Sequence, residues 1–236
     1  DQTGWTQAVT YSANGLQLAT GGNDRVVRIA DTDGYPFAQF SGHEGFIFGM
    51  DYTPDSLQLA SGDGDGVLIL WNVGSGGLLS ATTVGKDAIR ELDFSPKQEF
   101  LAVANATDGF KLLAYPSLRQ ICAFDGFSVL TTAVSNNNAF ITFGTEGGLL
   151  IRIDPTCGII DRTQAHNGAV NSVALSENGN MMISGGADGV VFVTPGAISL
   201  TGHTDSVESV AINPAGTLIA SASADGTIIL WGIPNK

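Results

Sequence analysis

The sequence predicts an all-β protein, and three observations support this prediction. Short runs in which apolar and polar residues alternate extend along the whole chain, and no segment of useful length has a helical period. Glycine supplies 31 of the 236 residues, and only 14% of the residues are charged, against about 25% in an average globular protein. Hydrophobic residues make up 43%, which is enough apolar surface to offset the entropy of ordering a compact chain. Such a chain turns often and folds into short strands.

The central unit of the pattern is a β-hairpin that occurs six times. Each copy has an alternating run, a pair of small residues, a tight acidic turn usually with glycine, and a second alternating run, as in LQLASGDGDGVLILWN. The six hairpins lie at 16–31, 57–72, 100–115, 140–154, 181–195 and 218–232. Their turn acids are Asp24, Asp65, Asp108, Glu146, Asp188 and Asp225.

Further strands flank each hairpin. A strand that runs into a turn rich in Asn, Pro or Gly precedes each one, as in IFGMDYTPDS at 47–56. A short fourth strand follows most of them, for example at 38–43, 120–126 and 198–203. Four short antiparallel strands that recur at about 40 residues are the signature of a propeller blade.

The repeated motifs resemble those of the WD40-repeat family. The resemblance is carried by Gly42-His43 through Trp71-Asn72, by Gly202-His203 through Trp231-Gly232, and by a degenerate copy at Ala165-His166. It covers the whole chain and implies a WD40-type β-propeller with six recognisable four-stranded antiparallel blades. We expect one domain over 1–236, with blades at about 1–43, 44–85, 86–126, 127–166, 167–203 and 204–236.

The resemblance also implies a hydrogen-bonded tetrad in some blades. The tetrad links a histidine, a second-strand Ser or Thr, the turn Asp and a third-strand Trp. Blade two matches with His43, Ser61, Asp65 and Trp71, and blade six with His203, Ser221, Asp225 and Trp231. Blade five has His166, Ser184 and Asp188 but carries Thr194 at the Trp position. All three histidines of the chain therefore receive a structural rather than a catalytic or metal-binding interpretation.

The sequence does not decide how the ring of blades closes. Blade six ends after its third strand, and four residues precede Trp5, fewer than the five or so of a normal outer strand. Either a six-bladed ring closes weakly, or the chain is a fragment of a larger ring or of an array. We expect six blades, the last without its outer strand, and an unpaired edge that invites pairing with another chain.

The charge balance limits the kinds of partner that the chain is expected to bind. The net charge is −13 and the ten basic residues are scattered, so we expect no direct binding of nucleic acid and no membrane insertion. The acidity is interpreted first as a source of solubility and second as a surface for a basic protein partner. Cys122 and Cys157 lack metal-ligand spacing and are interpreted as buried free thiols, with a single bridge as the alternative. No basic-apolar leader precedes residue 20. We therefore expect an intracellular location, cytoplasmic or nuclear.

No catalytic motif is found. The chain has no P-loop, GxGxxG, HExxH or GxSxG, and the run from Asp63 to Gly66 is better explained as a tight turn than as a Ca²⁺ loop. We expect no enzyme activity, no metal and no cofactor. The alternative is a metal-dependent hydrolase or lactonase at the propeller axis, in which Asn171 and Glu208 share a metal, although one carboxylate and one amide are a thin ligand set.

A partner-binding face is the leading functional hypothesis. Alignment of the first strands on Pro54, Pro96 and Pro214 places six residues at one equivalent position: Gln7, Phe48, Arg90, Leu130, Asn171 and Glu208. We predict that Trp5, Gln7, Phe46, Phe48, Arg90, Asn171 and Glu208 contact a partner. The alternative for Trp5 and Phe46 is burial in the core.

The resulting prediction is a non-catalytic scaffold that docks proteins or peptides and helps to assemble a multiprotein complex. Recognition of modified peptides by an aromatic and an acid, using Phe46 or Phe48 with Glu208 or Asp205, is the third alternative.

Overall fold

The computed structural model describes residues 4–233 of the chain and contains six antiparallel sheets. Strands are the only regular elements among these residues, so the predicted all-β class is confirmed. The chain divides into two compact units, Asp1–Gly126 and Phe127–Lys236, and each unit contains three of the sheets. The predicted single domain over 1–236 stays a prediction. No helix of the described residues is long and apolar enough to cross a membrane.

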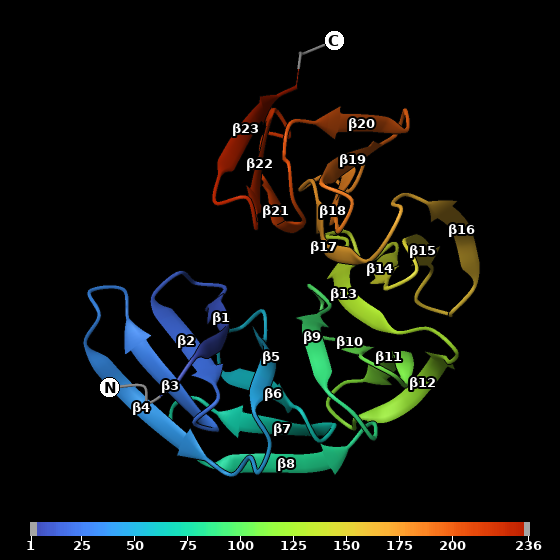
Figure 1. The fold of residues 1–236 in the computed structure, drawn as a ribbon. Coiled ribbons are helices and arrows are strands. Elements are labelled where there is room, and N and C mark those ends of the chain that lie inside the picture. Colours follow the sequence, from blue (N-terminus) through green and yellow to red (C-terminus); the bar gives the residue numbers. More distant parts are fainter. Residues whose placement is uncertain (1–3, 234–236) are drawn as a thin grey trace. The chain divides into compact units, whose positions relative to one another are not determined.

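The first unit contains three four-stranded sheets (Figure 1). The first sheet comprises β1 (Thr6–Tyr11), β2 (Gln17–Gly22), β3 (Val26–Asp31) and β4 (Pro36–Ser41). The second comprises β5 (Ile47–Tyr52), β6 (Gln58–Asp63), β7 (Val67–Asn72) and β8 (Leu78–Thr83). The third comprises β9 (Ile89–Phe94), β10 (Phe100–Asn105), β11 (Gly109–Ala114) and β12 (Arg119–Phe124).

The second unit contains two four-stranded sheets and one three-stranded sheet. The fourth sheet comprises β13 (Val129–Val134), β14 (Ile141–Thr145), β15 (Leu149–Ile153) and β16 (Ile159–Gln164). The fifth comprises β17 (Val170–Leu175), β18 (Met182–Gly186), β19 (Val190–Thr194) and β20 (Ile198–Thr201). The sixth comprises β21 (Val207–Ile212), β22 (Leu218–Ser223) and β23 (Ile228–Gly232), so its fourth strand is absent from the described residues, as expected.

Within each unit the sheets pack face to face. The first strand of one sheet contacts the first strand of the next, β1 with β5 and β5 with β9 in unit 1, and β13 with β17 and β17 with β21 in unit 2. Figure 1 shows the outer strands β4, β8 and β12 at the far ends of their sheets from β1, β5 and β9. Alternation along each strand sends apolar side chains to both faces, because each central sheet has a neighbour on both sides.

Blade two illustrates this two-sided burial. Ile69 and Trp71 of β7 face the first sheet, where the Trp71 ring stacks on Phe40 with centroids 5.4 Å apart. Leu68 and Leu70 of the same strand face the third sheet. A strand buried on both sides has little room for charged residues, which explains the low charge content of the chain.

The interpretation of the cysteines as buried free thiols is wrong. Cys122 and Cys157 are both disulfide-bonded, and both are half-buried. Disulfides persist mainly in oxidising environments. This observation removes the cysteines as support for a reducing compartment, and the cytoplasmic or nuclear location stays a prediction.

Candidate functional site

A buried polar network fixes the turn of blade two, with one correction to the sequence prediction. His43 Nε2 lies 2.6 Å from Ser61 Oγ, and Trp71 Nε1 donates to the same oxygen at 2.7 Å. His43 Nδ1 lies 2.8 Å from a carboxylate oxygen of Asp63, whereas the repeat pattern predicts Asp65 in this role. The assignment of Asp65 is therefore wrong.

The reason is that two acids occupy this turn, two residues apart. Asp63 is the last residue of β6 and is fully buried, so its carboxylate can reach the histidine. It also accepts hydrogen bonds from the backbone N–H groups of Asp65 and Val67, at 3.0 and 2.9 Å. Asp65 lies at the exposed tip of the turn. Burial lowers the pKa of His43, and the hydrogen bond and the charge of Asp63 oppose this shift.

Blades five and six contain the corresponding network with the turn acid that the sequence indicates. His203 lies 3.0 Å from Asp225 and 2.7 Å from Ser221, to which Trp231 Nε1 donates at 2.8 Å. The Thr227 hydroxyl and the Thr204 N–H donate to Asp225 and hold the pKa of that carboxyl below its usual range.

Blade five has the same geometry without the tryptophan. His166 lies 3.0 Å from Asp188 and 2.7 Å from Ser184, and Thr194 occupies the Trp position. Burial raises the pKa of Asp188, but hydrogen bonds from Asn167 and His166 outweigh this effect and hold it below its usual range. Ser184 is fully buried. All three histidines of the chain thus belong to networks that satisfy buried polar groups, which is a structural role.

The six aligned positions in the first strands share one backbone feature. In every sheet the pairing of the first and second strands shifts at this position, so that one extra residue forms a β-bulge. The extra residues are Gln7, Phe48, Arg90, Leu130, Asn171 and Glu208. A bulge releases a side chain from the regular alternation and re-aims it. We call the end of each sheet that carries this bulge and the acidic turn the leading end.

The leading end of unit 1 brings aromatic and cationic side chains together. The guanidinium carbon of Arg90 lies 5.0 Å from the centroid of the Phe48 ring, and Arg90 is exposed. Trp5 is 77% exposed and Phe46 is 42% exposed, so neither is buried in the core. Gln7 donates to the side chain of Asn23 at 3.2 Å. Partner binding by these residues stays a prediction.

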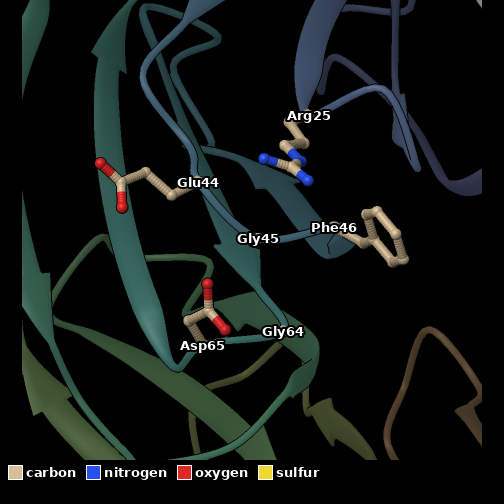
Figure 2. A pocket seen from close by; sticks show the side chains of 6 residues that line it. All are labelled: Arg25, Glu44, Gly45, Phe46, Gly64 and Asp65. Carbon is tan, nitrogen blue, oxygen red and sulfur yellow. The ribbon is translucent and has the colours of Figure 1, made fainter.

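A cleft of about 320 Å³ opens beside these residues (Figure 2). Its lining residues are Arg25, Glu44, Gly45, Phe46, Gly64 and Asp65. Figure 2 shows the Arg25 side chain on the Phe46 side of the cleft, with Asp65 and Glu44 on the other side of Gly45. The guanidinium carbon of Arg25 lies 5.8 Å from the Phe46 centroid. Sequence reasoning missed Arg25, Glu44 and Asp65 as components of a binding site.

The candidate residues of unit 2 have different surroundings. The Asn171 amide donates to Ser206 Oγ at 2.8 Å and to the Val207 carbonyl at 3.0 Å, so it ties blade five to blade six. Glu208 is exposed. Among residues 4–233, no three or more His, Cys, Asp and Glu side chains form a group that could hold a metal ion. The metal-dependent alternative and the pairing of Phe46 or Phe48 with Glu208 or Asp205 stay predictions.

The repeated sheets and their histidine networks define the class of the WD40-type β-propeller proteins. Comparison with known families agrees: the WD40 family, described as WD domain, G-beta repeat, matches residues 34–72, 158–193 and 197–232. The chain belongs to the WD40-repeat family.

Curated relatives match about three quarters of the chain. The chain is 27% identical over 197 residues to Autophagy-related protein 16 of Arabidopsis thaliana. The aligned region covers 78% of this chain and 37% of that protein. The chain is 27% identical over 186 residues to Eukaryotic translation initiation factor 3 subunit I of Scheffersomyces stipitis, covering 78% and 46%. It is 24% identical over 196 residues to WD repeat-containing protein 1 of Gallus gallus, covering 75% and 31%. The chain spans less than half the length of these relatives.

Proposed function

We propose that this chain is a non-catalytic interaction scaffold that docks a partner protein or peptide on the leading end of unit 1 and so helps to assemble a complex. The observation that carries the proposal is the stack of Arg90 on Phe48, two side chains that both stand at β-bulges. A relative whose name designates a subunit of a translation initiation factor is consistent with a role in a complex.

The stack suits binding for a physical reason. A guanidinium held on an aromatic face keeps its planar fork of N–H donors available while losing much of its motion before the partner arrives. Arg90 is exposed, and its side chain has no hydrogen bond or ion pair with any residue between 4 and 233. Arginine and large aromatic side chains are the residue types that most often dominate the energy of protein interfaces.

The exposed aromatic side chains of Trp5 and Phe46 extend this surface. Both side chains lie at the leading end of unit 1, and aromatic residues and arginine are the residue types enriched in the cores of protein interfaces. A protein partner with basic segments fits the net charge of −13.

The test is a double substitution, Phe48→Ala with Arg90→Ala, in the full chain. Proteins captured by cross-linking from the source organism are quantified by mass spectrometry for the native chain and the variant. We expect at least a tenfold loss of the captured partner and little change in thermal unfolding, because neither side chain is part of the buried core.

The matched control is Phe37→Ala with Arg119→Ala. Phe37 is 55% exposed on the outer strand β4, and Arg119 is exposed on the outer strand β12. This control removes the same residue types far from the leading end and should leave capture unchanged. Equal capture by the native chain and the Phe48–Arg90 variant would show that the partner docks elsewhere.

A further inference from the structure

Arg25 occupies a turn position that the other five hairpins give to glycine. The equivalent residues are Gly66, Gly109, Gly148, Gly189 and Gly226, which have φ angles of +76°, +80°, +83°, +75° and +82°. Arg25 has the same left-handed conformation, with φ of 65°. A residue with a Cβ atom is disfavoured in this region and glycine is not. The first hairpin therefore carries an arginine where its own fold favours glycine.

The side chain of Arg25 is directed into the cleft instead of into the protein core. Its guanidinium contacts the Phe46 ring and has no hydrogen bond or ion pair with another residue of the described chain. The nearby Arg28 is already paired with Asp24 at 2.7 Å. Arg25 therefore presents a charged, planar donor group that is held by an aromatic face and is available to a ligand.

The opposite side of the cleft carries negative charge. Glu44 and Asp65 both line it, both are exposed, and within the described part of the chain neither carboxylate is paired with a cation. Gly45 lies between Arg25 and these two carboxylates. It leaves the space between them open, because a Cβ atom there would lie 2.9 Å from a carboxylate oxygen of Asp65. The cleft thus holds a cation and two anions that do not neutralise one another.

We propose that Arg25 determines the specificity of this cleft, which binds a peptide segment carrying an acidic and a basic side chain a few residues apart. The acidic carboxylate accepts hydrogen bonds from Arg25, and the basic group pairs with Asp65 and Glu44. This inference rests on the proposed scaffold function and names the chemistry of the partner. A volume of about 320 Å³ accommodates one or two side chains of a docked peptide.

Two simpler ligands fit the cleft less well. A phosphate or another small anion would be attracted by Arg25 but repelled by Glu44 and Asp65. A lone or methylated lysine would seek the face of an aromatic ring, and the face of Phe46 already carries the Arg25 guanidinium. A segment with both charges matches each side of the cleft.

The experiment uses immobilised peptides with a Gly-Ser background and the labelled full chain. One set carries Glu and Lys one to four residues apart, a second carries Glu and Gln, a third carries Gln and Lys, and a fourth carries two Gln. We expect the native chain to bind the best Glu–Lys peptides at least fivefold more than any of the other three sets. Equal binding to all sets, or a preference for a single charge, overturns the proposal.

Substitutions in the cleft test which of its residues contacts the acidic and which the basic side chain of the peptide. Arg25→Gly restores the residue that the turn favours, so its thermal midpoint should stay within a few degrees of the native value. The variant should bind the Glu–Lys peptides no better than the Gln–Lys peptides. Asp65→Asn should reduce the contribution of Lys, and Arg119→Ala should change nothing. If Arg25→Gly still distinguishes Glu from Gln, Arg25 is not the determinant.

The two tests fail in distinguishable ways. Loss of partner capture in the Phe48–Arg90 variant, together with no peptide preference in the array, keeps the scaffold function and overturns the role of Arg25. Unchanged capture in the Phe48–Arg90 variant overturns the scaffold proposal at this face, and the array result then stands by itself for the cleft.

Discussion

His43 and Asp63 form a buried pair in blade two, with His43 Nδ1 2.8 Å from the carboxylate and both side chains removed from solvent. The same carboxylate also accepts two backbone N–H groups of the following turn. One side chain therefore holds both the loop that leads into the blade and the hairpin inside it. Its neighbour Asp65 is exposed and contributes to the cleft instead. The two acids of this turn therefore differ in place: Asp63 belongs to the buried network and Asp65 lines the cleft.

Alanine substitutions should separate these roles. Asp63→Ala leaves a buried imidazole and two backbone donors unsatisfied, so we expect the free energy of unfolding to fall by about 2–4 kcal/mol. Asp65→Ala should change it by no more than about 0.5 kcal/mol, as for other exposed positions. Urea unfolding followed by tryptophan fluorescence measures both, with Asp63→Asn as the control that retains an acceptor. Equal losses for the two alanine variants would return Asp65 to the network.

The pKa of His43 gives blade two a pH dependence. Burial lowers this pKa from the model-peptide value of 6.5, so at mildly acidic pH the unfolded chain binds a proton that the folded chain does not. The contribution of His43 to stability is therefore complete above pH 6.5 and is lost as the pH falls below that value. We expect the slope of unfolding free energy against pH between 5 and 6.5 to decrease in His43→Gln. An unchanged slope would mean that His43 has the same pKa in the folded and the unfolded chain.

Asp51 should have the opposite pH dependence. Its carboxylate is half-buried between β5 and β9, where Phe94 N–H donates to it at 2.7 Å. Burial raises its pKa from 3.8 to about 7, and the charge of Glu91 adds to this shift against the two backbone hydrogen bonds. Because the folded state retains the proton, the contribution is complete below about pH 4 and is lost as the pH rises through 7.

The substitution Asp51→Asn removes this titration and retains an acceptor for Phe94. Since one pKa unit corresponds to about 1.4 kcal/mol, we expect the variant to be about 2–4 kcal/mol more stable than the native chain at pH 8 and nearly equal to it at pH 4. Differential scanning calorimetry at the two pH values measures the change, and Asp33→Asn, at an exposed position, is the control. A variant that is no more stable at pH 8 would show that Asp51 is charged without penalty.

The sheets could be predicted from the sequence because their determinants are local. Alternating residues and glycine turns specify each hairpin, and the period of about 40 residues indicates how many there are. The alignment of the first strands also brought Phe48 and Arg90 to equivalent positions, which the structure shows to be bulges. Nothing in the alternation of these strands marks a bulge, because the extra residue shows only when the strand is paired.

Other features depended on contacts between distant residues. Asp63 and Asp65 fit the repeat equally well by spacing, and burial decides between them. The carboxylate of Asp51 is half-buried against the neighbouring blade, whose Phe94 lies about 40 residues away in the sequence. Arg25 did have a signal, since it replaces a glycine that the other hairpins share. The sequence alone shows this exception, because Asp65, Asp108, Asp188 and Asp225 are each followed by glycine and Asp24 is followed by Arg25.

The turn glycines offer a last prediction, on the blade that has three strands among the described residues. In blade three a Cβ atom on Gly109 would lie 2.1 Å from the carbonyl oxygen of Phe124, at the end of the fourth strand β12. In blade six, which has no fourth strand among the described residues, a Cβ atom on Gly226 would meet nothing within 4 Å. Both glycines have almost the same φ, +80° and +82°, so the two positions differ in space but not in backbone strain.

Alanine at these two positions separates strain from collision. Gly226→Ala should cost only the strain of the left-handed backbone, about 1–2 kcal/mol. Gly109→Ala should cost that strain plus about 1–3 kcal/mol for the displaced backbone of β12. Urea midpoints of the two variants at one pH measure the difference. If Gly226→Ala proves as damaging as Gly109→Ala, a segment covers the turn of blade six in solution, and the edge of β23 is not open.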